Sequence, residues 1–327
     1  MPLTFIRASK AESDPILAAA QRMEPDLRDA FMAAVAQVKD TVALDKLTEA
    51  VAAGDVNGAL AVLALDKSFA DALRGKGLEA GVQSFRDAVQ ATYAAGAKAA
   101  IAALPQKVSV DISFNLMSKE AQQWLETYDF KLIKDVSDSA IESIRQTILR
   151  AFQEGGHPYE QAREIRDAIG LTARQEAAVA NFENALSDPK TISDALSRSL
   201  RDGRYDPTLV RAARNQTPLS QAQIDKMTER YRERYINYRA QTVARTESIR
   251  ASNAGQREVW RQADEQGLFK GRDVQRVWIV SGDDRSCPDC LALDGQTAGL
   301  DEEFDDGVMA PPDPHPDCRC TTALQFS

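Results

Sequence analysis

Apolar residues recur at helical spacing through most of the chain. In stretches such as AAAQRMEPDLRDAFMAAVAQVKDTV and SFRDAVQATYAAGAKAAIAAL they stand three and four positions apart, which places them on one face of a helix. Glycine-containing turn signals at residues 53–55 and 74–77 separate these stretches. Residues 13–104 therefore predict several Ala-rich helices.

A short piece with a different period follows. The segment KVSVDISF, residues 107–114, alternates apolar and polar residues after Pro105. Strict alternation is typical of a half-buried strand, and proline is typical of a boundary. We therefore predict a strand or an extended arm here, at the start of a second region.

Two capping boxes mark the helices that come next. SAIE (139–142) and TARQ (172–175) each place a hydroxyl residue three positions before Glu or Gln, so that two side chains satisfy the free amides of a helix start. We predict one helix that begins at SAIE and stops at Gly155-Gly156. A second helix is predicted from TARQ to Asp188-Pro189.

One long segment, from about residue 220 to 265, lacks proline and keeps a helical spacing of aromatic and apolar residues, which predicts a single long helix. Past Gly267 the pattern changes. RVWIV (276–280) predicts a short strand, residues rich in Pro, Gly and Asp follow, and TTAL (321–324) predicts a closing strand.

The pattern indicates a mainly α fold, in which a multi-helix body with one long helix precedes a small α+β or irregular module. An aromatic content of 6% agrees with helices better than with an aromatic-rich sheet protein. A length of 327 residues suggests two or three domains. We predict an N-terminal helical region (1–104), a central helical domain (105–270) and a small Cys/His module (271–327).

No stretch of the chain has the pattern of a signal peptide or a membrane span. The N-terminus MPLTFIRASKAESDP lacks a basic start and an apolar core, and no run approaches the ~18–20 apolar residues of a span. We therefore expect a soluble protein, made in the cytosol, that has no membrane partner. The net charge of −9 argues against a protein that coats nucleic acid generally.

All four cysteines and one of the two histidines lie in two short segments, the first knuckle CPDC (287–290) and the second knuckle HPDCRC (315–320). Two residues between ligands let both converge on one ion, and His315 and Cys318 repeat the spacing of the first knuckle. The preferred ligands of a structural zinc ion are Cys287, Cys290, His315 and Cys318, with Cys320 as an alternative to His315.

Disulfides or free thiols, and a catalytic role, stay open as alternatives. A reducing cytosol favours metal over disulfides, and a small acidic module with few apolar residues needs a strong staple. Structural zinc supplies roughly 10–16 kcal/mol of apparent binding energy in zinc-finger peptides, against ~2–4 kcal/mol for a disulfide. Catalysis needs a nearby base, and His157 has the pattern of a loop residue. The acids of residues 301–306 lack calcium-loop spacing and indicate a solvated face.

Basic residues outnumber acidic ones between residues 226 and 276. The candidates for contact with DNA phosphates or an acidic partner are Arg230, Arg234, Arg245, Arg250, Arg257 and Arg261. The alternative is a solvated helix with ion pairs three residues apart, such as Glu229 with Arg232. In ARTE (244–247) the arginine and the glutamate do not face each other on a helix, so each is expected to pair elsewhere.

The order of these motifs resembles that of the phage Mu protein F-like head morphogenesis family, also called minor head proteins. The resemblance is carried by YRAQTVARTESIRASNAGQ, the Trp278 strand, DDRSCPDCLALDGQ and PPDPHPDCRC. It is strong over residues 230–324, weaker over 112–229 and absent before about residue 105.

This resemblance implies a non-enzymatic virion component of a phage or prophage. It would lie near the portal, act with the portal protein and with capsid or scaffold proteins during capsid assembly, and have double-stranded DNA as a further candidate partner in packaging or delivery. Two other functions are kept as alternatives: a DNA-binding protein that uses the arginine-rich helix at 226–276, and a zinc-dependent enzyme.

Overall fold

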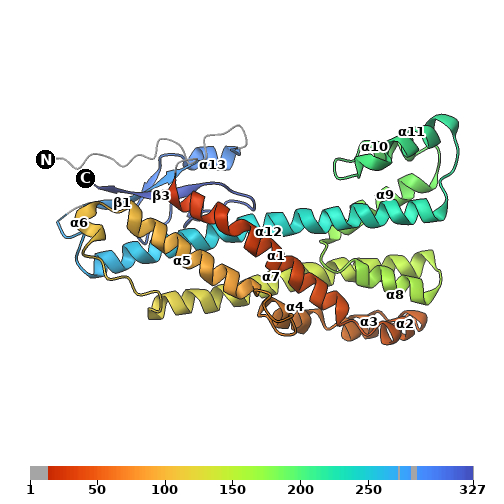
Figure 1. The fold of residues 1–327 in the computed structure, drawn as a ribbon, viewed down its shortest axis with the longest axis horizontal. Coiled ribbons are helices and arrows are strands. Elements are labelled where there is room, and N and C mark those ends of the chain that lie inside the picture. The colour runs from red at the N-terminus through yellow and green to blue at the C-terminus, as the bar shows by residue number, and fades with distance from the viewer. Residues whose placement is uncertain (1–13, 272, 281–285, 327) are drawn as a thin grey trace. The chain divides into compact units, whose positions relative to one another are not determined.

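The computed structural model describes residues 14–271, 273–280 and 286–326 and is mainly helical, which confirms the predicted fold class (Figure 1). The α-helices are α1 (Pro15–Asp40), α2 (Leu44–Ala52), α3 (Val56–Leu63), α4 (Leu65–Leu73), α5 (Phe85–Ala103), α6 (Gln106–Ser109), α7 (Lys119–Glu154), α8 (Pro158–Asp167), α9 (Ala173–Ser187), α10 (Ile192–Leu196), α11 (Asp206–Asn215), α12 (Gln221–Glu265) and α13 (Pro288–Leu293). The strands are β1 (Val274–Ile279), β2 (Thr297–Ala298) and β3 (Thr321–Phe326).

The chain divides into two compact units, and each combines segments that are far apart in the sequence. Unit 1 comprises Met1–Phe31, Gly81–Phe130 and Gln241–Ser327, and unit 2 comprises Met32–Ala80 and Lys131–Ala240. The predicted division into residues 1–104, 105–270 and 271–327 concerns consecutive regions and stays a prediction.

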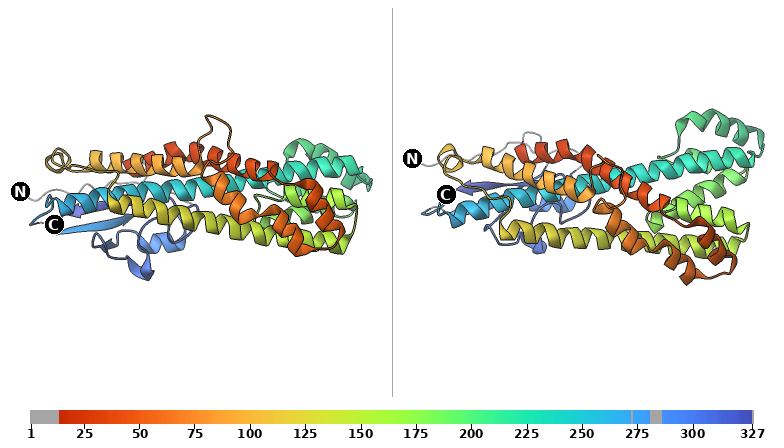
Figure 2. Two further views of the ribbon diagram at one scale, coloured as in Figure 1. Left: turned by 90° about the horizontal axis from the view of Figure 1, so that it is seen from below. Right: turned by 60° about the horizontal axis from the view of Figure 1, so that its bottom comes forward.

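In unit 1, α5 and the C-terminal half of α12 pack with their backbones in close approach. A Cβ on Gly255 would lie 2.1 Å from the Tyr93 carbonyl oxygen, and one on Gly96 would lie 2.3 Å from the Ser252 carbonyl oxygen. Both distances are shorter than atoms tolerate, so only glycine permits this crossing. The two helices run side by side in both views of Figure 2, with α5 in light orange and α12 in cyan.

Of the two forms predicted for residues 107–114, a strand or an extended arm, the strand is wrong. The segment contains the short helix α6, and the residues after it form irregular chain. Two glutamines take the place of a partner strand: Gln266, the residue after α12, bonds both backbone groups of Ser113, and Gln262 of α12 bonds both backbone groups of Asn115. The alternation has a different cause, because Ile112 and Phe114 pack against the helical core while Ser113 between them is exposed.

The three strands form one antiparallel sheet in the order β2-β1-β3, which confirms the two predicted strands at 276–280 and 321–324. On one face of β1, Ile279 packs against Leu17 and Ile249 of the helices. On the other face, Arg276 and Trp278 are completely buried. The sheet therefore joins the helices of unit 1 to the C-terminal loops.

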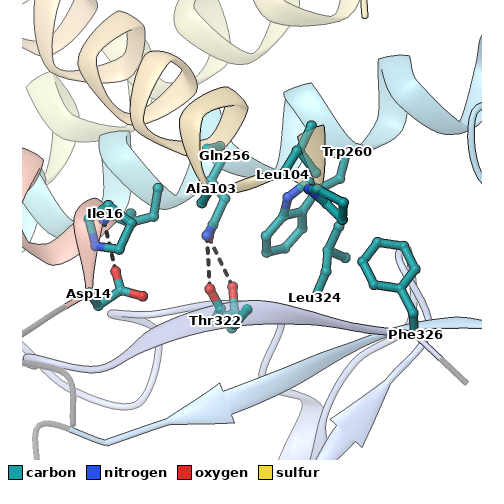
Figure 3. Close-up of a pocket in the computed structure, with 13 residues that line it drawn as sticks. Asp14, Ile16, Ala103, Leu104, Gln256, Trp260, Thr322, Leu324 and Phe326 are labelled. Carbon is teal, nitrogen blue, oxygen red and sulfur yellow. Dashed lines mark hydrogen bonds between the residues drawn. The ribbon is translucent and has the colours of Figure 1, made fainter. Parts of the chain in front are cut away.

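The first turn of α1 is fixed by a buried carboxylate. Asp14 Oδ1 accepts the amides of Ile16 and Leu17 at 2.8 and 3.0 Å, and burial raises the pKa of this carboxyl group. Figure 3 shows Asp14 beside β3, where the Gln256 side chain donates to the Thr322 carbonyl at 2.8 Å. The apolar cavity between these elements holds about 60 Å³. Thr321 Oγ1 of β3 also donates to Asp14 Oδ1 at 3.4 Å, so these contacts attach the start of α1, and α12, to β3.

In unit 2, one predicted capping box is confirmed and the other is wrong. Thr172 and Gln175 form the reciprocal bonds of a capping box at the start of α9, which ends at Ser187 as predicted. SAIE, in contrast, lies inside α7, where Ser139 Oγ donates to the Val136 carbonyl and accepts from Arg239. The apolar period continues through this site, with Val136, Ala140 and Ile144 buried, so packing extends the helix past the capping motif. The predicted end of this helix before Gly155-Gly156 is confirmed.

Arg150 links three helices of unit 2. From α7 it donates to Glu164 of α8 at 2.7 Å and to Glu176 of α9 at 2.8 Å, and the Glu176 side chain is 2% exposed. Phe182 of α9 stacks on Tyr231 of α12 with a centroid distance of 4.1 Å. Unit 2 therefore has both a polar and an aromatic contact at its centre.

Candidate metal centre

The first knuckle folds as the start of a short helix. Cys287 is the N-cap of α13, and its Sγ accepts the amide of Cys290 at 3.3 Å, while Pro288 occupies the first helical position, where no amide is needed. Cys290, one turn on, is 2% exposed. The CPDC sequence therefore brings both sulfurs to the same end of α13.

The second knuckle is a bent loop that leads into β3. Asp317 adopts a left-handed backbone conformation with φ 64°, and the Cys318 Sγ accepts the amide of Cys320 at 3.4 Å. Amide hydrogen bonds to sulfur favour a thiolate. Each knuckle thus has one cysteine whose sulfur accepts an amide, from three positions on in the first knuckle and from two positions on in the second.

The five residues converge in two overlapping groups. Cys287, Cys290 and His315 form one group, Cys290, Cys318 and Cys320 form the other, and the ligand atoms in each group lie within 4.8 Å of one another. His315 Nε2 lies 3.0 Å from Cys287 Sγ and 3.1 Å from Cys290 Sγ, and the Cys290 and Cys318 sulfurs are 3.7 Å apart. All four cysteines are free thiols. Cys290 belongs to both groups and is the centre of the cluster.

The imidazole of His315 is oriented as a metal ligand. Its Nδ1 lies 2.6 Å from the Pro316 carbonyl oxygen, which can only accept a hydrogen bond. Nδ1 therefore carries the proton, and the lone pair of Nε2 points toward the sulfurs of Cys287 and Cys290. A backbone carbonyl that holds the second ring nitrogen in this way is the usual support of a metal-bound histidine.

The thiols are held in an environment that disfavours bare thiolates. Contact with the Cys318 thiol, followed by burial, raises the pKa of Cys290 well above its ordinary range. Burial also raises the pKa of the Cys287 thiol, against the lowering effect of the Cys290 amide. A cation that binds here must displace protons and stabilise the thiolates itself.

The donor set fits a zinc ion. Thiolate and imidazole are the ligands that zinc prefers, and two Zn–S bonds of about 2.3 Å at the tetrahedral angle separate their sulfurs by about 3.8 Å. The separation of the Cys290 and Cys318 sulfurs, 3.7 Å, agrees with this value. The cysteines and histidine can therefore bind a metal ion.

A polar cavity of about 260 Å³ opens beside the cluster, lined by Cys287, Cys290, His315 and Cys320 together with Arg245 and Asp317, among others. Cys318 does not line it and is 1% exposed. Beneath the cluster, Cys290, Cys318 and Cys320 pack with Trp278, Leu293 and Phe304 in a small apolar core. Leu291 of α13, one of the few apolar residues of this module, is 54% exposed. The acids at 301–303 and 305–306 are exposed, as predicted.

The ARTE motif holds the second knuckle, a connection that the sequence analysis missed. Arg245 pairs with Glu24 of α1 at 3.0 Å and with Asp317 at 3.4 Å, and Glu247 accepts from Tyr128 and Arg250. The prediction that Arg245 and Glu247 pair elsewhere is confirmed. In the sequence, the only sign of these contacts was that the ARTE motif and the HPDCRC knuckle occur in the same chain.

Most of the candidate contact arginines bind groups of this chain. In unit 2, Arg230 pairs with Glu233, and Arg234 bonds the Arg201 carbonyl and pairs with Asp202. Glu229 pairs with Arg232 as predicted.

In unit 1, Arg250 pairs with Glu247, and Arg261 pairs with Glu120, Glu258 and Glu265. Arg257 is half-buried and its Nε has no hydrogen-bond partner. Contact of these arginines with DNA or with a partner stays a prediction.

A protein family model described as "Phage Mu protein F like protein" matches residues 190–323. Comparisons with curated proteins and with solved structures gave no match. Among the described residues, no helix combines the length and the apolar character needed to cross a membrane. The resemblance inferred from the sequence motifs is thus supported over residues 190–323, which contain α12 and both knuckles and are similar to the phage Mu protein F-like family.

Proposed function

We propose that this protein is a phage head morphogenesis protein of the minor head type, a structural component of the virion. The observation that carries this proposal is the family match over residues 190–323. Its candidate partners are other virion proteins, namely the portal protein and capsid or scaffold proteins, and its expected place is in the capsid near the portal. The chain would be made in the cytoplasm of the bacterial host.

Copurification tests this assignment. We expect a tagged form of the full chain, expressed together with the head genes of its phage or prophage, to copurify with the portal protein or with procapsids. Normal procapsid assembly without this gene, together with absence of the chain from procapsids that are assembled when the gene is present, would contradict the assignment. Binding to duplex DNA that weakens steeply as salt rises would support the DNA-binding alternative instead.

A structural role for the cysteine cluster supports a protein without catalytic activity. The imidazole nearest the thiols, that of His315, has its lone pair directed at two sulfurs and its other nitrogen on the Pro316 carbonyl. It is therefore placed as a ligand and has no free nitrogen to act as a base. A zinc-dependent enzyme would need a separate acid or base beside an open coordination position.

We further propose that the cluster holds one structural zinc ion through Cys287, Cys290, His315 and Cys318. The tautomer of His315 supports this set over one in which Cys320 replaces the histidine. Bound zinc would join α13 to the loop before β3, which are otherwise linked through the small apolar core beneath the cluster.

Metal analysis with a thiol count tests the ligand set. For protein purified without chelator, we expect one zinc per chain and three thiols that react faster with a thiol reagent after chelation, while the reaction rate at Cys320, which is 3% exposed, does not change. Faster reaction of all four thiols after chelation would instead establish coordination by cysteines alone. A chain with no metal and no reactive thiol after denaturation would show that the cysteines form disulfides.

A further inference from the structure

The two knuckles share a Pro-Asp pair before a cysteine, but their aspartates lie in different surroundings. Asp289 of CPDC is exposed on α13. Asp317 of HPDC lies between two candidate ligands, two residues after His315 and one before Cys318, and its side chain is 35% exposed. The same residue in the same local sequence is therefore on the surface in one knuckle and in a contact in the other.

Asp317 is bound by three residues on one face of α12. Thr242 Oγ1 donates to Oδ2 of Asp317 at 3.3 Å, and Arg245 Nη1 donates to Oδ1 at 3.4 Å. The amide of Asp317 donates in turn to Thr246 Oγ1 at 3.0 Å. The positions 242, 245 and 246 are three and four apart, so one helical face bonds both the side chain and the backbone of this residue.

The backbone conformation of Asp317 determines the course of the second knuckle, so the bonds from Thr242, Arg245 and Thr246, which together anchor Asp317, also fix this loop. Its φ of 64° is in the left-handed region, which aspartate tolerates better than most residues. The bend at Asp317 sets the direction in which the chain leaves His315 and enters Cys318. Arg245 is itself held by Glu24 at 3.0 Å, so the anchor rests on α1 as well as on α12.

We propose that Asp317 is a positioning residue, which locks the second knuckle onto α12 so that His315 and Cys318 meet the sulfurs of the first knuckle. This inference rests on the proposed metal site. Residues that orient metal ligands from outside the coordination sphere typically change metal affinity by 10–100-fold when they are replaced. We expect an effect of this size from the loss of the Asp317 carboxylate.

A purely structural tether would behave differently. The bonds to the Asp317 carboxylate are long, at 3.3 and 3.4 Å, and partly exposed, so they contribute little to the stability of the chain without metal. The positioning role therefore predicts a large change in metal affinity with little change in the melting temperature of the metal-free protein. A purely structural tether predicts a lower melting temperature of the metal-free protein with little change in metal affinity.

Zinc titration of the full chain against a chromophoric chelator tests the proposal. We expect Asp317→Ala to bind Zn²⁺ 10–100-fold more weakly than the unaltered chain, because the knuckle no longer has a fixed bend. Asp289→Ala is the matched control, and its affinity should stay within about threefold, since its carboxylate has no comparable contact with the residues that the structure describes. Melting of the metal-free forms supplies the second readout.

The outcomes separate this inference from the metal site on which it rests. If the unaltered chain binds no zinc, the proposed metal site fails and the inference fails with it. If the unaltered chain binds zinc and Asp317→Ala binds it as tightly as Asp289→Ala does, only the positioning role is overturned. Should Asp317→Ala not fold, Asp317→Asn decides, because asparagine accepts the same backbone conformation and keeps one acceptor oxygen; its affinity should lie between those of the other two.

Discussion

We expect Cys290→Ser to abolish zinc binding and to lower the stability of the protein to that of the metal-free chain. Cys290 is the residue shared by both groups of ligand atoms, so its loss leaves neither group complete. An ion present at about 1,000 times its dissociation constant stabilises the folded state by about 4 kcal/mol. Thermal unfolding with and without a chelator measures this difference.

Cys320→Ser is the matched control for this prediction. Cys290 and Cys320 are 2% and 3% exposed and belong to the same apolar core, so both changes bury a hydroxyl in place of a thiol. We expect Cys320→Ser to keep one zinc per chain and to melt at a higher temperature than Cys290→Ser. After chelation the two variants should melt alike. Equal loss of metal from both would show that Cys320 is a ligand, and retention of metal by both would place the ion elsewhere.

The sequence predicted those parts of the fold in which local pattern and packing agree. The apolar period in the sequence agrees with the pattern of buried residues in the Ala-rich helices, in the helix capped by Thr172 and in the two strands at 276–280 and 321–324. The predictions that failed were local signals overruled by long-range contacts. Residues 107–114 alternate like a strand, but Gln262 and Gln266, at the end of α12 and just after it, bond the backbone of Ser113 and Asn115 in place of a partner strand. The SAIE motif fits a capping box, but continued burial extends α7 through it.

For the candidate site, the sequence predicted the convergence of the cysteines and His315 but missed what holds them. Ligand spacing is a local property, so the two knuckles could be read from residues two positions apart. The anchor of Asp317 joins residues more than 70 positions apart, and its partners Thr242 and Thr246 are residue types that occur on any helix surface. The pairing of Arg245 with Glu24 spans a still longer separation. The arginine pattern showed the same limit, because the sequence could not reveal which cations bind carboxylates of the same chain.

Arg276 provides a second large effect, which does not depend on metal. This arginine of β1 is completely buried and donates to the backbone carbonyls of Gly299, Glu302 and Met309, while its guanidinium lies 4.8 Å from the centre of the Phe304 ring. Phe304 packs edge-on against Trp278 at 5.3 Å. One side chain thus holds the long loop between β2 and β3 against the sheet, under the small core that carries the cysteines.

We expect Arg276→Met to destabilise the protein by about 3 kcal/mol, measured by urea unfolding. Each buried carbonyl that loses its donor costs about 1–3 kcal/mol, and relief from burying a cation offsets part of the total. Burial lowers the pKa of Arg276 to about 10, below its value in the unfolded chain. The unfolded chain therefore holds this proton more tightly, and the titration of Arg276 raises the free energy of unfolding only as the pH rises above about 9. The effect of the substitution should therefore be constant from pH 5 to pH 8.

Arg257→Met is the control for loss of a half-buried cation in the same unit. The Nε of Arg257 has no hydrogen-bond partner, so no carbonyl loses this nitrogen as its donor when the residue is replaced. We therefore expect the free energy of unfolding to change by less than about 1 kcal/mol. If the two variants unfold at the same urea concentration, the carbonyl bonds of Arg276 do not stabilise the loop. If Arg276→Met is the less stable, its zinc content decides how the loop and the knuckles are related. A variant that is destabilised but still holds one zinc would mean that the loop and the metal stabilise this region independently, whereas a parallel loss of zinc would mean that the buried arginine supports the second knuckle as well.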